Sequence, residues 1–154
     1  MLYHISKLHR DEQELVKKAP LLVSILVAGA DGEVDSEEIN RTVQLIHTKS
    51  FSESSDIRHL YREIDHDVEP ALTAILKGLP TDVVEREKRL SEELEGLNSI
   101  LAKLDPQIAT DFYNSLKGFA LRVAQTSGGI LGMGPLGHHE KEMIKLPMLK
   151  YPGI

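Results

Sequence analysis

Apolar residues recur along most of this chain at spacings of three and four, the period of an α-helix. No stretch alternates apolar and polar residues as a half-buried strand does. The pattern predicts an all-α fold, one compact bundle of about seven to eight helices. Four stripes carry this prediction: Ile39, Val43 and Ile46; Ile57, Leu60 and Ile64; Val83, Leu90, Leu94, Leu97, Leu101 and Leu104; Ile108, Phe112, Leu116, Phe119, Ala120 and Val123.

Capping residues suggest where these helices begin and end. We expect a short polar helix over residues 11–18 and a second helix that opens at Pro20, because proline suits a first helical turn. Asp35 or Ser36 caps the next. Further helices are expected over residues 56–65, 68–79, 81–104 with Thr81 as cap, and from Asp105-Pro106 to about residue 126. The charged face of the 81–104 helix is expected to lie in solvent: Glu85, Arg86, Lys88, Arg89, Glu92 and Glu93.

The length of 154 residues predicts a single domain over residues 1–154. Residues 127–137 read as a connector, since five glycines in ten residues do not sustain a helix. A short terminal helix is expected over residues 138–146, followed by a loose tail over residues 147–154.

Composition narrows the function. The formal net charge is −6 and no Lys/Arg cluster stands out, so a nucleic-acid partner is not expected. With no cysteine, disulfides and thiolate chemistry are excluded. The start of the chain lacks the features of a signal peptide. The longest apolar run, residues 20–30, is short of the ~20 residues that span a bilayer, so we expect a cytoplasmic protein without a membrane span.

Carboxylates concentrate between the second and third predicted helices. Five of them, counting Glu37, fall within the eight residues 31–38, around a glycine. Oxygen ligands in a turn suit a hard divalent cation such as Ca²⁺, Mg²⁺ or Mn²⁺. The segment is not an EF-hand, since Ser36 and Thr42 stand where that loop requires glycine and glutamate. The other interpretation is a helix start, with Gly32 in the turn and Asp35 and Glu38 at capping-box spacing.

Residues 26–38, Leu-Val-Ala-Gly-Ala-Asp-Gly-Glu-Val-Asp-Ser-Glu-Glu, resemble the signature of the TerB-like tellurite-resistance family. That family's pattern is an apolar helix ending in Ala-Asp-Gly, then a glutamate that opens a helix. Ala30, Asp31 and Gly32 match the first part and Glu38 the second. The resemblance implies a compact all-helical domain linked to tellurite and stress resistance, with no catalytic reaction. A related domain belongs to a DnaJ-like co-chaperone, which implies a protein partner.

The resemblance also implies divalent-metal binding at the acidic turn. Asp31, Asp35 and Glu38 would be the main ligands, with Glu33 assisting. The family tends to repeat this turn before a later helix, and Glu140 is placed like Glu38. No Asp-Gly precedes Glu140, and two extra residues, His138 and His139, do. Whether any of these three joins the acidic turn is left open.

Two enzyme classes have part of their motifs in this chain. His139-Glu140 begins a zincin motif, but Met143 breaks it. A phosphohydrolase of the HD type would draw on His47 or His59, on His66-Asp67, and on Asp105 or Asp111. Asp65 or Asp67 serves equally as the cap of the helix that follows.

The sequence therefore leads to three hypotheses: a non-enzymatic TerB-like metal-binding domain, an interaction module without metal, and a metal phosphohydrolase. The first is preferred. The sequence names neither the partner nor the metal, and it leaves open both a homo-oligomer and any role of tellurite itself.

Overall fold

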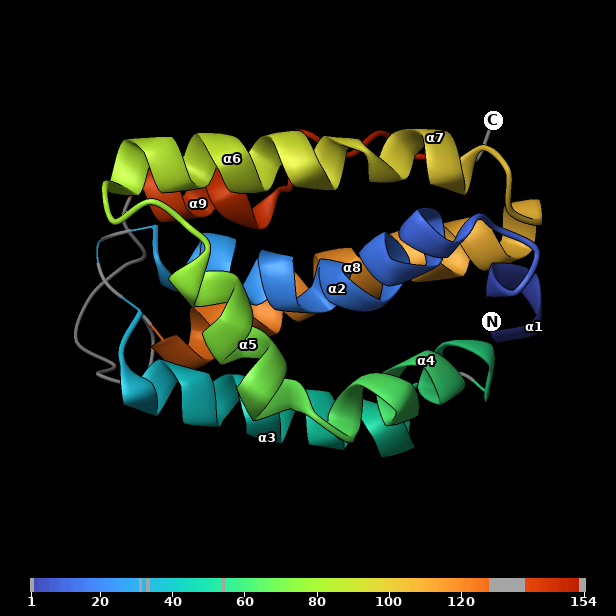
Figure 1. The fold of residues 1–154 in the computed structure, drawn as a ribbon, viewed down its shortest axis with the longest axis horizontal. Helices are drawn as coiled ribbons and strands as arrows, with labels where there is room; N and C mark the ends of the chain where they lie inside the picture. Colours follow the sequence, from blue (N-terminus) through green and yellow to red (C-terminus); the bar gives the residue numbers. More distant parts are fainter. Residues whose placement is uncertain (1, 31, 33, 54, 128–137, 153–154) are drawn as a thin grey trace.

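The structure, a computed structural model, describes residues 2–152 except 31, 33, 54 and 128–137. The described residues form helices and connecting turns, which confirms the predicted all-α bundle (Figure 1). The helices are α1 (Leu2–Ile5), α2 (Arg10–Ala28), α3 (Ser36–Ser52), α4 (Ser55–Asp65), α5 (Val68–Lys77), α6 (Val83–Glu95), α7 (Leu97–Leu101), α8 (Pro106–Ser127) and α9 (His138–Ile144). Helix α6 runs almost directly into α7, and when the two are counted as one, the described residues form eight helices, as predicted.

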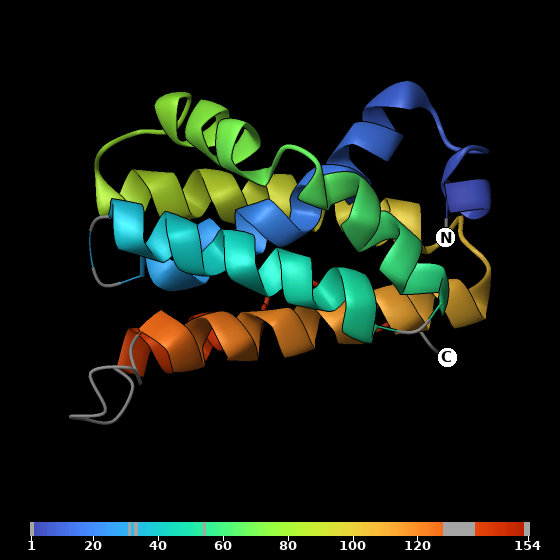
Figure 2. The same ribbon diagram turned by 90° about the horizontal axis from the view of Figure 1, so that it is seen from below.

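Helix α2 is the centre of the bundle, and α8 packs along it. Figure 1 shows α6 and α7 on one side of α2 and α3 and α4 on the other, and Figure 2 shows α5 and α8 on opposite sides of the molecule. Every residue of α2 from Ala19 to Ala28 is buried. The aromatic side chains of Phe112 and Phe119, on α8, are fully buried in the same core. This arrangement fits the apolar character of α2 on most of its faces.

The expected break before Pro20 is wrong, because α2 continues through that residue. An internal proline removes one helical hydrogen bond and costs about 3 kcal/mol. Val16 and Ala19 before it, and Leu22 and Val23 after it, are 0 % exposed. Each large apolar side chain that is buried stabilises the fold by roughly 1.5–3 kcal/mol. Together these contributions outweigh the hydrogen bond that Pro20 removes.

The expected helix over residues 81–104 also differs from the structure. Its cap is Asp82, whose Oδ2 accepts from the Glu85 backbone N–H at 3.0 Å, and not Thr81. Gly96 divides the stretch into α6 and α7. The cap of α8 is as predicted, since Asp105 Oδ1 accepts from the backbone N–H of Gln107 at 3.0 Å.

The tail expected to be loose is held against the bundle at its beginning. Leu149, within the tail, is 6 % exposed, and Leu146, the residue before it, is 0 % exposed. Asn98, on α7, donates from Nδ2 to the carbonyl of Met148 and accepts from the N–H of Lys150, both at 2.9 Å. A side-chain amide thus pairs with this segment as a neighbouring strand would. The connector expected at residues 127–137 lies, apart from Ser127, outside the described residues.

Within the described part of the chain, none of the helices combines the length and the apolar character needed to cross a bilayer.

Candidate functional site

The acidic turn between α2 and α3 was the main prediction from sequence. Of its four predicted metal ligands, Asp31 and Glu33 lie outside the described residues. Asp35 and Glu38 are brought together at the start of α3. Asp35 Oδ1 accepts from the Glu38 N–H at 2.8 Å, and Glu38 Oε2 accepts from the Asp35 N–H at 3.3 Å. The predicted capping box is therefore confirmed, and it fixes where α3 begins.

A buried arginine from another helix reaches into the same turn. Arg86, on α6, is 7 % exposed. Its Nη2 donates to the carbonyl oxygen of Gly29 at 2.8 Å and to that of Gly32. Both carbonyls follow the end of α2, where helical partners are missing and the helix dipole is negative. The guanidinium thus supplies hydrogen bonds and positive charge at the acidic turn.

The expectation that Arg86 lies in solvent with the rest of its charged run is therefore wrong. The sequence did contain a signal. Arg86, Leu90 and Leu94 are spaced by four, so they share one face of α6, and all three are buried. Arg89, which is off that face, is exposed.

Two glycines of the turn are required by the backbone and by Arg86. A Cβ on Gly29 would lie 2.8 Å from Arg86 Nη2 and 3.1 Å from Val34 Cγ2, so a larger residue would displace the guanidinium. Gly32 has φ +153°, a conformation that residues with a Cβ rarely adopt. The local structure thus requires glycine at both glycine positions of the Ala-Gly-Ala-Asp-Gly string.

The described residues contain no group of three or more His, Asp or Glu side chains placed to hold a metal ion. That statement does not cover Asp31 and Glu33, nor the side chains of His138, His139 and Glu140. Helix α9, which carries those last three, packs against α2 and α8. Arg86 places a positive charge where a cation bound through Gly29 or Gly32 would approach.

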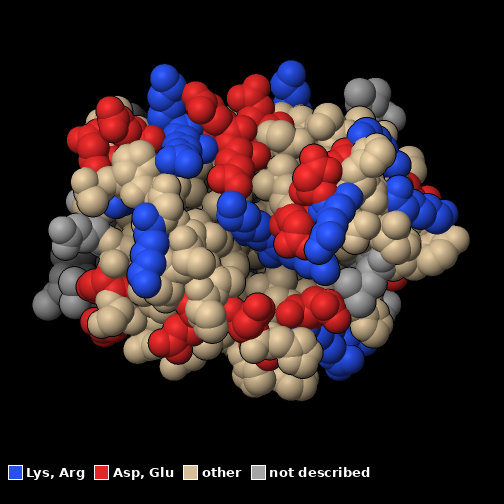
Figure 3. Space-filling model, in the orientation of Figure 1, with Lys and Arg blue, Asp and Glu red and all other residues tan. Residues whose placement is uncertain are grey.

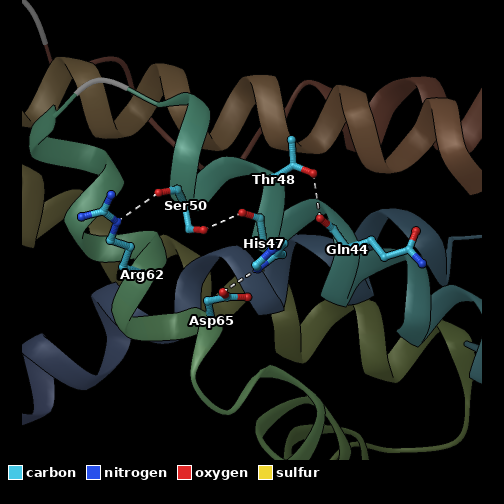
Figure 4. A network of polar contacts seen from close by, with 6 residues as sticks. All are labelled: Gln44, His47, Thr48, Ser50, Arg62 and Asp65. Carbon is cyan, nitrogen blue, oxygen red and sulfur yellow. Dashed lines mark hydrogen bonds and ion pairs between the residues drawn. The ribbon is translucent and has the colours of Figure 1, made fainter.

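The residues proposed for an HD-type site are distributed over separate places. His47 Nδ1 contacts Asp65 Oδ2 at 2.8 Å (Figure 4), and the same region is tied together by Arg62 Nε, which donates to the Ser50 carbonyl at 3.3 Å. These contacts join the end of α3 to α4. Of the other candidates, His66 and Asp67 line one hollow, Asp105 lines a second and Asp111 lines a third.

A polar chain that the sequence did not predict joins α8 to α3 and α4. Lys49 Nζ donates to Glu53 Oε1 at 2.6 Å, and Ser115 Oγ donates to the same oxygen at 3.0 Å. Ser115 Oγ is 3.1 Å from the hydroxyl of Tyr61, which is fully buried. Since the Ser115 proton points to Glu53, Tyr61 is the donor in that contact. Burial raises the pKa of Tyr61, because the phenolate would lose its hydration.

A groove of about 740 Å³ opens between α2, the end of α4 and α5. Apolar side chains from all three helices line it: Leu21, Ile64, Ala71 and Ile75. Charged and polar residues surround them: Glu14, Lys17, Lys18, Glu63, His66 and Asp67. Figure 3 shows acidic and basic side chains intermixed around the middle of the molecule, in the orientation of Figure 1.

Comparison with known proteins finds a similarity to one archaeal protein. The chain is 29% identical over 124 residues to an uncharacterized protein, ORF11', of Methanothermobacter thermautotrophicus, and the match covers 75% of this chain and 74% of that protein. The name of this relative states no activity. No family model matches the chain. No solved structure matches it either.

Proposed function

We propose that this chain is a non-enzymatic, TerB-like helical domain related to tellurite or stress resistance, and that it acts by binding a protein partner. In this proposal the acidic turn is a structural joint, meaning that its role is to connect α2 to α3. The guanidinium of Arg86 takes the place that a bound metal cation would have. The observation that favours a structural role of the turn over a metal site is the pair of hydrogen bonds from Arg86 to the carbonyls of Gly29 and Gly32.

Electrostatics supports a joint over a metal site. The carbonyl oxygens of Gly29 and Gly32, which would be hard-cation ligands, already accept from a guanidinium. Asp35 and Glu38 already satisfy the first N–H groups of α3 and its N-cap. A divalent ion placed beside Arg86 would be repelled by about 1 kcal/mol per unit charge at 4 Å even in water, and more at a partly buried site.

The spacing of the turn supports the TerB-like assignment. The apolar helix α2 ends at Ala28, close before the Ala30-Asp31-Gly32 string. Glu38 is at the third position of α3, where its side chain bonds the N-cap. Two of the positions that carry the resemblance, Gly32 and Glu38, are therefore positions at which the local structure favours the residue found there.

Divalent-metal binding by Asp31, Asp35 and Glu38, assisted by Glu33, is the second candidate. One observation favours it: the carboxylates of Asp35 and Glu38 meet at the same helix start, and Asp35 is exposed. Added Ca²⁺, Mg²⁺ or Mn²⁺ would then complete a site with the two carboxylates of the preceding turn.

A thermal-shift panel separates the two candidates. The melting temperature of the wild type is measured in EDTA and in millimolar Ca²⁺, Mg²⁺ or Mn²⁺, beside Asp31→Ala. If the turn is a joint, the metals should leave the melting temperatures of the wild type and of Asp31→Ala unchanged. A rise in the wild type that is lost in Asp31→Ala would establish the metal site, since a ligand that binds only the folded state stabilises it.

A further inference from the structure

One wall of the groove between α2, α4 and α5 is formed by α5, a helix with few buried residues. Only Val68 and Leu72 are buried in α5. Ala71 and Ile75, one helical turn apart, are partly buried and face the groove. Leu21 and Ile64 are the buried apolar residues opposite. An apolar stripe on α5 thus has only part of its surface covered by the domain itself.

The edge of this groove is acidic. Lys18 is paired with Glu93 at 2.6 Å, so its charge is compensated. Among the described residues, no ion pair is formed by Lys17, Glu14, Glu63 or Asp67. Three carboxylates and one ammonium leave a local charge of about −2, with His66 counted as neutral. The chain as a whole carries −6.

We propose that this groove binds a basic amphipathic segment of a partner protein. Apolar side chains of the segment would pack on the half-buried Ala71 and Ile75, beside Leu21 and Ile64, while its Lys or Arg residues would face Glu14, Glu63 and Asp67. This is the mode in which an amphipathic helix lies in an apolar groove, with charges along the edge fixing orientation. A second copy of this chain is a poorer occupant, because each copy brings a net charge of −6.

This inference names the surface and the partner chemistry for the protein binding proposed above, and rests on that function. It is independent of the acidic turn, because the groove and the turn share no residue. Failure of groove binding would therefore leave the interpretation of Arg86 intact, and the reverse also holds.

The test uses two helical peptides and the full chain. One peptide places Leu at i, i+3, i+4 and i+7 with Lys elsewhere, and the other replaces every Lys by Glu. Fluorescence anisotropy should show binding of the Leu/Lys peptide, weakened by added salt, and at least tenfold weaker binding of the Leu/Glu peptide. Equal binding of both peptides would overturn the proposal.

Matched variants locate the binding. Glu63→Lys with Asp67→Lys should weaken binding of the Leu/Lys peptide at least tenfold. Glu85→Lys with Glu142→Lys changes the net charge equally at exposed residues outside the groove, and should change it far less. If both double variants weaken binding equally, the attraction is general and the proposal fails. Should the groove variant not fold, the amide shifts of the wild type decide, because the peptide must perturb α5 and Leu21 before other regions.

Discussion

The guanidinium of Arg86 bonds two carbonyl oxygens that lie beyond the end of α2, where the helix offers them no partner. Gly29 leaves the space that this side chain occupies. Asp35 and Glu38 then satisfy the N–H groups that open α3. These side chains determine where one helix ends and the next begins.

Asp35→Ala should lower the free energy of unfolding by about 1 kcal/mol, because the cap of α3 is lost. Asp35→Asn should stay near the wild type, since asparagine caps about as well as aspartate. Urea denaturation measures both variants. If Asn destabilises the protein as much as Ala does, the carboxylate charge matters more than the cap, and the role assigned to Asp35 is wrong.

Tyr61 predicts a dependence of stability on alkaline pH. Burial raises its pKa in the folded protein, whereas the unfolded chain releases the proton near pH 10. The contribution of Tyr61 is thus fully present below about pH 10 and decreases as the pH rises further, by at most about 1.4 kcal/mol per pH unit. Tyr61→Phe should remove this decrease from urea midpoints measured between pH 9 and pH 11. An identical pH profile in the variant would contradict the assignment.

At the scale of elements, helix periods were predictable and helix ends less so. The Asp105-Pro106 start and the Asp35 cap combine a capping residue with a change of pattern, and both are found. Pro20 misled because its local preference is outweighed by the burial of its neighbours in α2. The beginning of the tail is held because Leu149, together with Leu146 just before the tail, is buried in the core. The short sequence of the tail does not reveal this contact.

Asn98→Ala should destabilise the packing of the segment 146–150, since it removes the donor to Met148 and the acceptor for Lys150. We expect a loss of about 1–3 kcal/mol in urea denaturation and faster cleavage after Lys150 in limited proteolysis. Ser99→Ala is the control, because the Ser99 hydroxyl is exposed and bonds only within its own turn. Equal effects of the two variants would mean that Asn98 does not hold the tail.

At the scale of the whole molecule, fold class follows from the period of the apolar residues, while the candidate site follows only in part. Asp35 and Glu38 are near in sequence, so their contact was predictable. Arg86 is more than fifty residues from Gly29, and its charged neighbours hid its place on the buried face. The groove unites Leu21 with Ile75, and a single sequence carries no signal for such pairs. The polar chain from Lys49 to Tyr61 depends on long-range packing in the same way.

Arg86 also connects the layers of the bundle, because it reaches from α6 to the turn that joins α2 to α3. The central claim is that Arg86 stabilises this turn through its charge and its hydrogen-bond donors, and not through its volume. Arg86→Met keeps most of the side-chain volume and removes the donors, while Arg89→Met makes the same change at an exposed position of α6.

Urea denaturation of these two variants beside the wild type is the most direct test. The account predicts that Arg86→Met lowers the free energy of unfolding by about 1–3 kcal/mol, because the Gly32 carbonyl loses its Arg86 donor and the buried Gly29 carbonyl keeps only the N–H of Gly32. Arg89→Met should stay within about 0.5 kcal/mol of the wild type. Equal stabilities of the two variants would contradict the assignment of Arg86 as the cation of the acidic turn.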